Sequence, residues 1–191
     1  MADITIALAG NPNAGKSTIF NVLTGLHQHT GNWPGKTVEK KEGEFEYKGI
    51  TVNIVDLPGT YSLTAYSPEE IIARDYIIEE RPDVVINVVD ATNLERNLYL
   101  TVQLLELDVP VVMALNMTDD LHKDGAKINL DELSQFLGNI PVVHTSANRG
   151  KGVSELIARA VKTANKLKKV CHPERNEGSP AQHHDASLRS A

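Results

Sequence analysis

The chain has 191 residues, 41% of them hydrophobic and 23% charged, and a formal net charge of −6. These values indicate a globular domain long enough to bury a core, and the acidic balance argues against nucleic acid as the main partner, because nucleic-acid-binding proteins usually carry a basic face. The single cysteine, Cys171, excludes an internal disulfide, the start of the chain does not resemble a signal peptide, and no apolar run approaches the roughly 18 residues of a membrane-spanning helix.

The first predicted elements are a strand, a glycine-rich loop and a helix. The segment "ITIALA" at residues 4–9 has the apolar run of a buried strand, and "STIFNVLTGL" at 17–26 has the periodicity of an amphipathic helix. Between them, "GNPNAGKST" fits the pattern G-x-x-x-x-G-K-[ST]. Because loop N–H groups and a helix N-terminus together attract anions, the sequence predicts a site for nucleotide phosphates.

Individual roles follow from the chemistry of the loop residues. Lys16 is expected to reach the β- and γ-phosphates, and Ser17 to ligate magnesium through its hydroxyl. Gly15 is expected to let the backbone approach the phosphates where a Cβ would clash. The loop residues assigned to the nucleotide are Gly10, Asn11, Pro12, Asn13, Ala14, Gly15, Lys16, Ser17 and Thr18.

The next segment, residues 26–41, lacks periodicity and contains several turn formers, so we expect a structureless stretch that is functional or mobile. Residues 43–59 alternate like an antiparallel hairpin that turns near Lys48. The hairpin ends in "VDLPG", where Asp56 is predicted to hold magnesium through a water and Gly59 to offer its N–H to a γ-phosphate. The alternative is an ordinary strand-ending turn, which Asp, Pro and Gly also favour.

From residue 67 onward, helices and strands alternate. Helical patterns and continuous apolar strands follow one another at 67–80, 83–91, 94–107, 109–117, 129–138, 140–147 and 152–169. This alternation predicts a parallel sheet covered on both faces. The expected fold is a three-layer α/β domain over residues 1–169, with a mostly parallel sheet of six to seven strands and one antiparallel strand. Residues 170–191 are polar and aperiodic, and we expect a disordered tail.

Two stretches at predicted strand ends indicate guanine. In "NMTD", Asp119 can accept from the N1–H and N2–H₂ of guanine, donors that adenine does not present, and Asn116 can brace the loop. Met117 replaces the lysine of the usual N-K-x-D motif and can lie against the base as an apolar plate. In "TSA", the N–H of Ala147 is expected to meet guanine O6. An ordinary polar strand exit is the alternative for either stretch alone. The residues assigned to the base site are Asn116, Met117, Asp119, Ser146, Ala147 and Asn148.

Four stretches together resemble the N-terminal G domain of the bacterial ferrous iron transporter FeoB, a Ras-like P-loop GTPase of the TRAFAC class: "GNPNAGKSTIFNVLTG", "GNWPGKTVEKKEGEF", "IVDLPGTYSLTAYSPEE" and "LNMTD". The resemblance covers residues 4–168. It implies a GTP-binding domain at the cytoplasmic face of the bacterial inner membrane, attached to a membrane-spanning iron-permease region of the same protein. No nucleic-acid partner is expected, and assembly into a homo-oligomer is left open. That family usually carries a helical spacer domain after the G domain, and residues 170–191 do not show one.

The resemblance also implies a first switch loop at residues 33–36. Thr37 would ligate magnesium in the GTP state, and Asn13 would hold an activating potassium ion whose shell the Trp33 and Gly35 carbonyls complete. The alternative for Asn13 is a plain turn residue. The residues of this segment assigned to the nucleotide are Gly35, Lys36 and Thr37.

GTP hydrolysis depends on positioning and charge neutralisation more than on covalent chemistry. The residues assigned to catalysis are Lys16, Asn13, Thr37 and Gly59, and those assigned to magnesium are Ser17, Thr37 and Asp56. Thr60 stands where Ras-like enzymes have a glutamine and is too short to orient the attacking water, so we expect slow turnover. Glu69 and Glu70 suit a helix N-terminus, and this role is favoured over organising the second switch.

Two other function classes stay open at this stage. A ribosome- or tRNA-associated GTPase would share the phosphate loop and the D-x-P-G motif, although such proteins usually carry a basic RNA-binding appendage. A nucleotide-dependent binding module with incidental turnover is the other. Iron binding by this chain is not predicted, because no Cys/His spacing matches a metal site.

Overall fold

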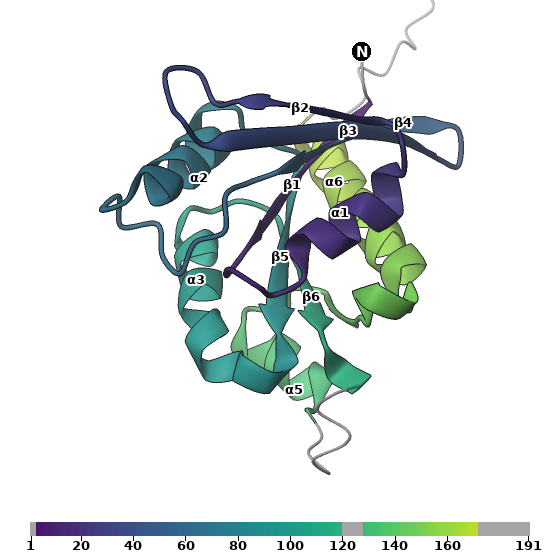
Figure 1. The fold of residues 1–191 in the computed structure, drawn as a ribbon. Helices are drawn as coiled ribbons and strands as arrows, with labels where there is room; N and C mark the ends of the chain where they lie inside the picture. Colours follow the sequence, from purple (N-terminus) through teal and green to yellow (C-terminus); the bar gives the residue numbers. More distant parts are fainter. Residues whose placement is uncertain (1–2, 120–127, 172–191) are drawn as a thin grey trace, which may run out of the picture.

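The structure, a computed structural model, describes residues 3–119 and 128–171, with the backbone alone for 167–171. In this part of the chain, one sheet of seven strands has the order β2-β3-β4-β1-β5-β6-β7 (Figure 1). The strands are β1 Ile4–Gly10, β2 Gln28–Asn32, β3 Glu39–Tyr47, β4 Ile50–Asp56, β5 Val84–Asp90, β6 Val111–Asn116 and β7 Val142–His144. The helices are α1 Lys16–Thr24, α2 Pro68–Glu79, α3 Leu94–Glu106, α5 Leu130–Phe136 and α6 Val153–Cys171, with 3₁₀ turns η1 Ala91–Asn93 and η2 Ala147–Arg149.

Strand direction follows the prediction. The pairs β4–β1, β1–β5, β5–β6 and β6–β7 are parallel, whereas β3 runs antiparallel to both of its neighbours, β2 and β4. The chain turns from β3 into β4 at Lys48 and Gly49, whose φ angles of 51° and 79° lie in the left-handed region that such a tight turn requires. The mostly parallel sheet with one antiparallel strand is therefore confirmed, as is the hairpin turn.

Helices cover both faces of the sheet (Figure 1). On one face α1 and α6 pack through side chains such as Phe20 and Leu156, and on the other α2 and α3 pack through side chains such as Leu100. Strand β1 contributes to both cores, because Leu8 points to the first and Ala7 to the second. A strand that is buried on both faces reads as a continuous apolar run, which is why the three-layer arrangement is predictable from the sequence.

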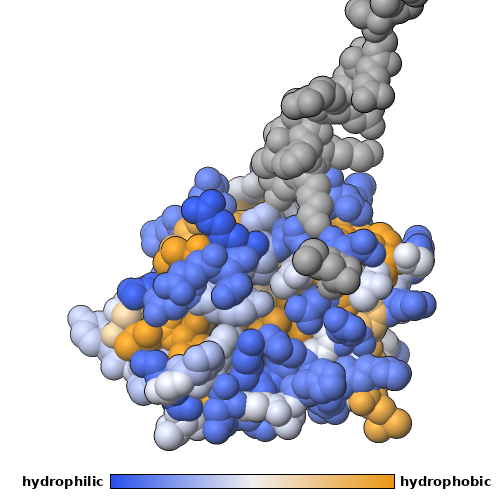
Figure 2. All heavy atoms as spheres, turned by 90° about the horizontal axis from the view of Figure 1, so that it is seen from above, coloured by the Kyte–Doolittle hydropathy of each residue, from blue (hydrophilic) through white to orange (hydrophobic). Residues whose placement is uncertain are grey.

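The segment from 26 to 41 differs from its prediction. Gln28–Asn32 forms β2, which pairs with the first half of β3, so the expectation of a structureless stretch is wrong there. All five side chains of β2 are exposed and the strand lies at the edge of the sheet. Such a strand needs no apolar alternation, so its sequence carries no strand signal. Seen from above the β2–β3 side, the surface is mainly hydrophilic with separate apolar patches (Figure 2).

Helix α6 continues to Cys171, slightly beyond the predicted domain end at residue 169. The rest of the predicted tail, 172–191, lies outside the described residues. None of the helices described is both long enough and apolar enough to cross a bilayer.

The fold gathers the predicted motifs at one edge of the sheet. The phosphate loop follows β1, "VDLPG" ends β4, "NMTD" begins at the last residue of β6, and "TSA" follows β7. These four strands run in parallel, so the loops that follow them lie at the same edge. In open α/β sheets the ligand crevice lies outside this carboxyl edge.

Candidate nucleotide-binding site

The loop between β1 and α1 has the geometry of a phosphate cradle. Gly15 adopts φ 91°, and a Cβ there would overlap the side-chain amide of Asn116. A Cβ on Gly10 would lie 2.6 Å from the carbonyl oxygen of Val88. Both glycines are thus required by close approach, and Asn13 joins them in the left-handed region with φ 66°.

A hollow of about 550 Å³ lies beside this loop. Its lining residues come from three of the predicted motifs: Asn11, Pro12, Asn13, Gly15, Lys16, Ser17, Thr18, Gly59 and Met117. Gly59 packs directly on the phosphate loop, because a Cβ there would lie 3.3 Å from the Cα of Pro12. The structure therefore brings the phosphate loop, the end of "VDLPG" and the start of the base motif around one cavity.

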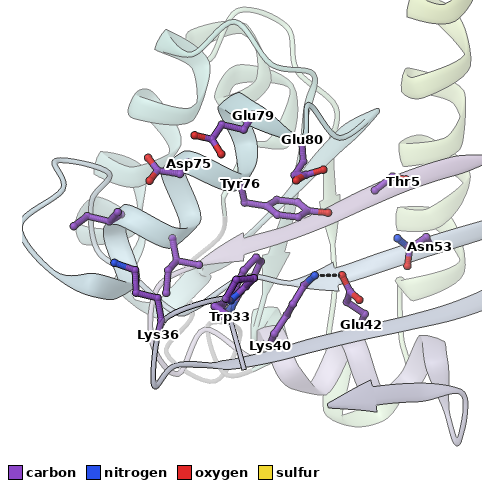
Figure 3. Close-up of a pocket in the computed structure, with 13 residues that line it drawn as sticks. Thr5, Trp33, Lys36, Lys40, Glu42, Asn53, Asp75, Tyr76, Glu79 and Glu80 are labelled. Atoms are coloured by element: carbon purple, nitrogen blue, oxygen red, sulfur yellow. Dashed lines mark ion pairs between the residues drawn. The ribbon is translucent and has the colours of Figure 1, made fainter. Parts of the chain in front are cut away.

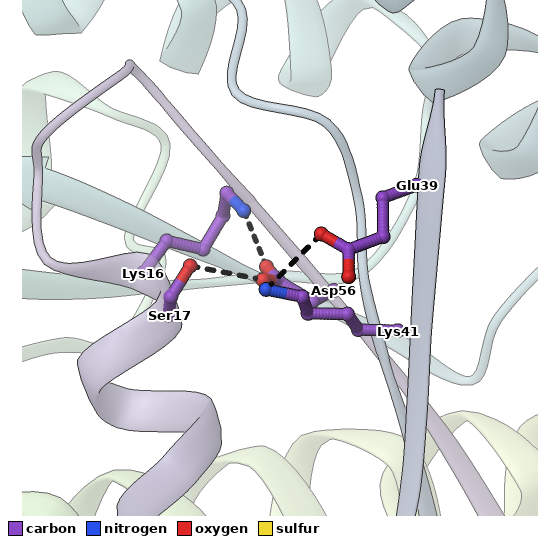
Figure 4. A network of polar contacts seen from close by, with 5 residues as sticks. All are labelled: Lys16, Ser17, Glu39, Lys41 and Asp56. Atoms are coloured by element: carbon purple, nitrogen blue, oxygen red, sulfur yellow. Dashed lines mark hydrogen bonds and ion pairs between the residues drawn. The ribbon is translucent and has the colours of Figure 1, made fainter. Parts of the chain in front are cut away.

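The floor of the site holds a buried polar cluster at the end of β4 (Figure 4). Lys16 Nζ forms an ion pair with Asp56 Oδ1, and Ser17 Oγ donates to Asp56 Oδ2 at 3.2 Å. Lys16 and Asp56 are both buried. A hydroxyl and a carboxylate are the hard oxygen ligands that magnesium prefers. Since Ser17 and Asp56 are already in contact, they fit the magnesium role that the sequence predicts for them.

Asn116, at the end of β6, connects three loops. Its Nδ2 donates to the carbonyl of Ala14 at 2.9 Å, and its Oδ1 accepts from Thr145 Oγ1 at 3.2 Å and from the N–H of Ala147 at 3.1 Å. The side chain is buried, with 2% exposure for the residue. The amide therefore joins the phosphate loop to both strands of the base site, as the predicted bracing role requires. The N–H of Ala147 is engaged by Asn116 here, and its contact with guanine O6 stays a prediction.

Asp119 is held on both carboxylate oxygens. Ser146 Oγ donates to Oδ1 at 2.8 Å, and Arg149 Nε lies 3.2 Å from Oδ2. The hydroxyl of Thr118 donates to the carbonyl of Thr145 at 3.3 Å, which adds a second link between the same two loops. Sequence reasoning missed Arg149, since no motif marks it and only the turn at η2 returns it to Asp119.

The first switch segment lies away from the hollow at the phosphate loop. Trp33 is 8% exposed and packs edge-to-face on Tyr76 of α2, with ring centroids 5.5 Å apart (Figure 3). Lys40 Nζ lies 5.0 Å from the Trp33 ring centroid and pairs with Glu42 at 2.5 Å. Burial, reinforced by the carboxylates of Glu42 and Glu80, raises the pKa of the Tyr76 phenol above its ordinary value. Trp33 thus fastens the segment to the second switch helix.

This placement bears on the predicted metal ligands. Trp33 and Lys36 line a separate hollow of about 490 Å³ against α2, and Thr37 is exposed. None of Trp33, Gly35 and Thr37 lines the hollow at the phosphate loop. The structure does not bring these three to Ser17, Asp56 or Asn13, and their magnesium and potassium roles stay predictions for a different position of the segment.

Comparison with known proteins places the chain among its relatives. The family model described as "Ferrous iron transport protein B" matches residues 4–160. The chain belongs to this family. The Fe(2+) transport protein A/Fe(2+) transporter FeoB fusion protein of Porphyromonas gingivalis is 51% identical over 178 residues, which cover 92% of this chain and 21% of that protein. The Fe(2+) transporter FeoB of Escherichia coli K12 is 53% identical over 160 residues, covering 82% of this chain and 21% of that protein.

Solved FeoB structures have the same fold. A Streptococcus-type match, the S. thermophilus NFeoB mutant bound to GDP, is 54% identical with a TM-score of 0.80, covering 84% of this chain and 62% of that chain. The FeoB G domain from Methanococcus jannaschii is 51% identical with a TM-score of 0.76, covering 86% and 99%. The chain is therefore a FeoB N-terminal G domain with a P-loop GTPase fold, which favours the main interpretation over a ribosome- or tRNA-associated GTPase. It spans 21% of the length of the curated relatives.

In this FeoB-family G domain, Glu70 organises the second switch loop. Its carboxylate accepts from Ser62 Oγ at 2.6 Å, from the N–H of Tyr66 at 2.9 Å and from Thr64 Oγ1 at 3.2 Å. These hydrogen bonds, that of Ser62 first, lower the pKa of Glu70 below its ordinary value. Ser67 caps α2 by accepting from the Glu70 N–H. The helix-dipole role favoured from sequence is thus incomplete, because the carboxylate reaches back over the preceding loop.

Thr60 faces the same loop of the FeoB-family domain. Its hydroxyl donates to the carbonyl of Ser62 at 2.7 Å, and its N–H donates to the carbonyl of Gly10 at 3.2 Å. The residue is buried. The side chain at the glutamine position therefore serves the loop's own structure.

Proposed function

We propose that this chain is the GTP-binding and slowly GTP-hydrolysing regulatory domain of a bacterial ferrous iron transporter. The single observation that carries the proposal is the buried Asn116 network, which fixes the guanine-reading loops to the phosphate loop. A relative with 54% identity is described as bound to GDP, which supports the same ligand class here.

Base choice rests on Asp119. A carboxylate accepts hydrogen bonds only, so it suits the N1–H and N2–H₂ edge of guanine and finds no pair of donors on adenine. Ser146 and Arg149 hold the carboxylate, and Met117 lines the hollow from which a base would be reached. We therefore expect guanine nucleotides to bind in preference to adenine nucleotides.

Phosphate binding rests on Lys16 and the loop amides. Lys16 is buried beside the cradle with its charge already oriented by Asp56, so little reordering is needed for the ammonium to meet a phosphate. We assign the magnesium site to Ser17 and Asp56, joined by Thr37 in the GTP state. Magnesium, when bound, neutralises charge on the β- and γ-phosphates.

We expect hydrolysis to be slow and stimulated by potassium. Thr60 is directed into the loop at residues 60–62 and offers nothing to the attacking water. Asn13 lines the hollow and is held in the left-handed conformation, where its side chain is available to a monovalent cation. The Trp33 and Gly35 carbonyls would complete that cation's shell after the switch segment moves. A binding module with incidental turnover is the remaining alternative, and single-turnover hydrolysis with and without potassium separates the two.

The parent protein supplies the rest of the function. The chain spans 21% of the length of the FeoB relatives, and we propose that the remainder contains the membrane-spanning iron-permease region, with this domain on the cytoplasmic face. We place the G domain at residues 1–169. Direct iron binding and nucleic-acid binding are not part of the proposal.

Exchange of the base-reading group tests the function. Asp119→Asn should weaken GDP binding and strengthen binding of xanthosine diphosphate, because an amide donor suits the C2 carbonyl of xanthine. The matched control is Asp131→Asn, an exposed carboxylate in the first turn of α5, which should bind as the wild type does. The wild type should prefer GDP over ADP by at least about tenfold, or roughly 1.4 kcal/mol. Equal affinity of the wild type for ADP and GDP would overturn the proposal.

A further inference from the structure

Arg149 lies in a turn built to return its side chain to the base site. The N–H of Arg149 donates to the carbonyl of Ser146 at 2.9 Å, and Gly150 follows with φ 64°. Ser146 and Lys151 exchange both backbone hydrogen bonds, at 3.1 and 3.2 Å, which closes the turn. The backbone that places Ser146 on one oxygen of Asp119 therefore also fixes where Arg149 begins.

The two contacts of Asp119 leave room for a base. A carboxylate has about four lone-pair directions, two on each oxygen. Ser146 takes one on Oδ1, and Arg149 takes one on Oδ2 through a single Nε contact. One acceptor direction on each oxygen is left, which is the number that guanine N1–H and N2–H₂ require together.

Holding both oxygens also fixes the plane of the carboxylate. The terminal torsion of an aspartate is broad and has no sharp staggered minimum. A carboxylate held only through Oδ1 can rotate away from a planar base, whereas one held through Oδ1 and Oδ2 cannot do so without breaking a contact. A donor on each side therefore pre-organises the acceptor edge.

We propose that Arg149 is a positioning residue for guanine recognition, which holds Oδ2 of Asp119 toward the base and ties the 146–150 turn across the mouth of the site. The proposal rests on the proposed guanine-nucleotide function. Without Arg149, guanine nucleotides leave faster and the contribution of the guanine 2-amino group to affinity declines.

The exposure of Arg149 separates this role from a structural one. Its side chain is 54% exposed, and ion pairs of that kind contribute little to folding stability. Arg159 provides a matched control, because its side chain is 52% exposed and pairs with Glu155 at 3.5 Å on α6. A variant of either arginine should fold, so differences in nucleotide binding report on the base site.

The test compares Arg149→Ala, Arg149→Lys and Arg159→Ala with the wild type. Dissociation rates and affinities are measured for GDP and for inosine diphosphate, which lacks the 2-amino group, with melting temperature as the folding control. Arg149→Ala should release GDP about three- to tenfold faster, the scale of a partly exposed charge-assisted contact. Its ratio of GDP to inosine diphosphate affinity should fall by a similar factor, and Arg149→Lys should lie between.

Salt gives a second readout. At about 0.5 M salt, where screening acts within a few ångströms, the difference between the wild type and Arg149→Ala should shrink. Arg159→Ala should match the wild type in both rates and ratio. Slower GDP release from Arg149→Ala would mean that the arginine competes with the base and would overturn the proposal, as would an unchanged ratio. A wild type that does not prefer GDP over ADP would instead refute the proposed function.

Discussion

Removal of the Asn116 side chain should both destabilise the fold and weaken nucleotide binding. Asn116→Ala deletes three buried hydrogen bonds, to the Ala14 carbonyl, the Thr145 hydroxyl and the Ala147 N–H. At about 0.5–1.5 kcal/mol each, their loss should cost about 2–4 kcal/mol. That is a large part of the roughly 5–15 kcal/mol by which a domain is stable. For a chain of this size the melting temperature should fall by roughly 5–15 °C.

An isosteric change refines the same prediction. In Asn116→Asp the acceptor contacts with Thr145 and Ala147 can persist, but the donor to the Ala14 carbonyl is replaced by an oxygen. Two acceptors then face each other in a buried site, so Asn116→Asp should be at least as destabilising as Asn116→Ala. Both variants should bind GDP more weakly, since the Ala14 carbonyl belongs to the phosphate loop.

The assay is chemical and thermal unfolding of the nucleotide-free protein, followed by GDP titration. Asn21→Ala is the control, because Asn21 is an exposed residue of α1 and its change should stay within about 0.5 kcal/mol. A loss below about 0.5 kcal/mol for Asn116→Ala would refute the argument that this buried network contributes to folding.

Three further predictions concern the ion and the two switches. Hydrolysis should be faster in potassium than in sodium, and Asn13→Ala should abolish the difference with GDP binding largely intact; ion-independent turnover by the wild type would contradict this. Trp33, the only tryptophan, should change its fluorescence between GDP and a non-hydrolysable GTP analogue, because leaving Tyr76 alters its surroundings, and Thr37→Ala should weaken the change and slow hydrolysis; identical emission in both states would favour a permanently packed loop. The hydrogen bonds that lower the pKa of Glu70 below 4.5 stabilise the folded state above that pH, so the difference in unfolding free energy between wild type and Glu70→Gln should be constant near neutrality and shrink as pH falls through the folded pKa; a difference that does not change on acidification would count against it.

The sequence by itself determined the fold class and the phosphate cradle, because both depend on local or periodic signals. Buried parallel strands are continuous apolar runs, and a loop that must take φ 91° beside Asn116 requires Gly15. The order of the motifs along alternating strands and helices then places them at one edge of the sheet. Lys16, Ser17, Gly59 and Met117 meet there as expected.

Only the tertiary structure decided the contacts that join residues without a shared local pattern. β2 exists because β3 offers it hydrogen-bonding groups, while its own side chains are all exposed and give no signal. Trp33 is buried because Tyr76, from a distant helix, covers it. Arg149 reaches Asp119 through a turn whose closure depends on backbone hydrogen bonds. Each of these pairings brings together groups that are remote in the chain or exposed in its local elements, and periodicity carries no information about such partners.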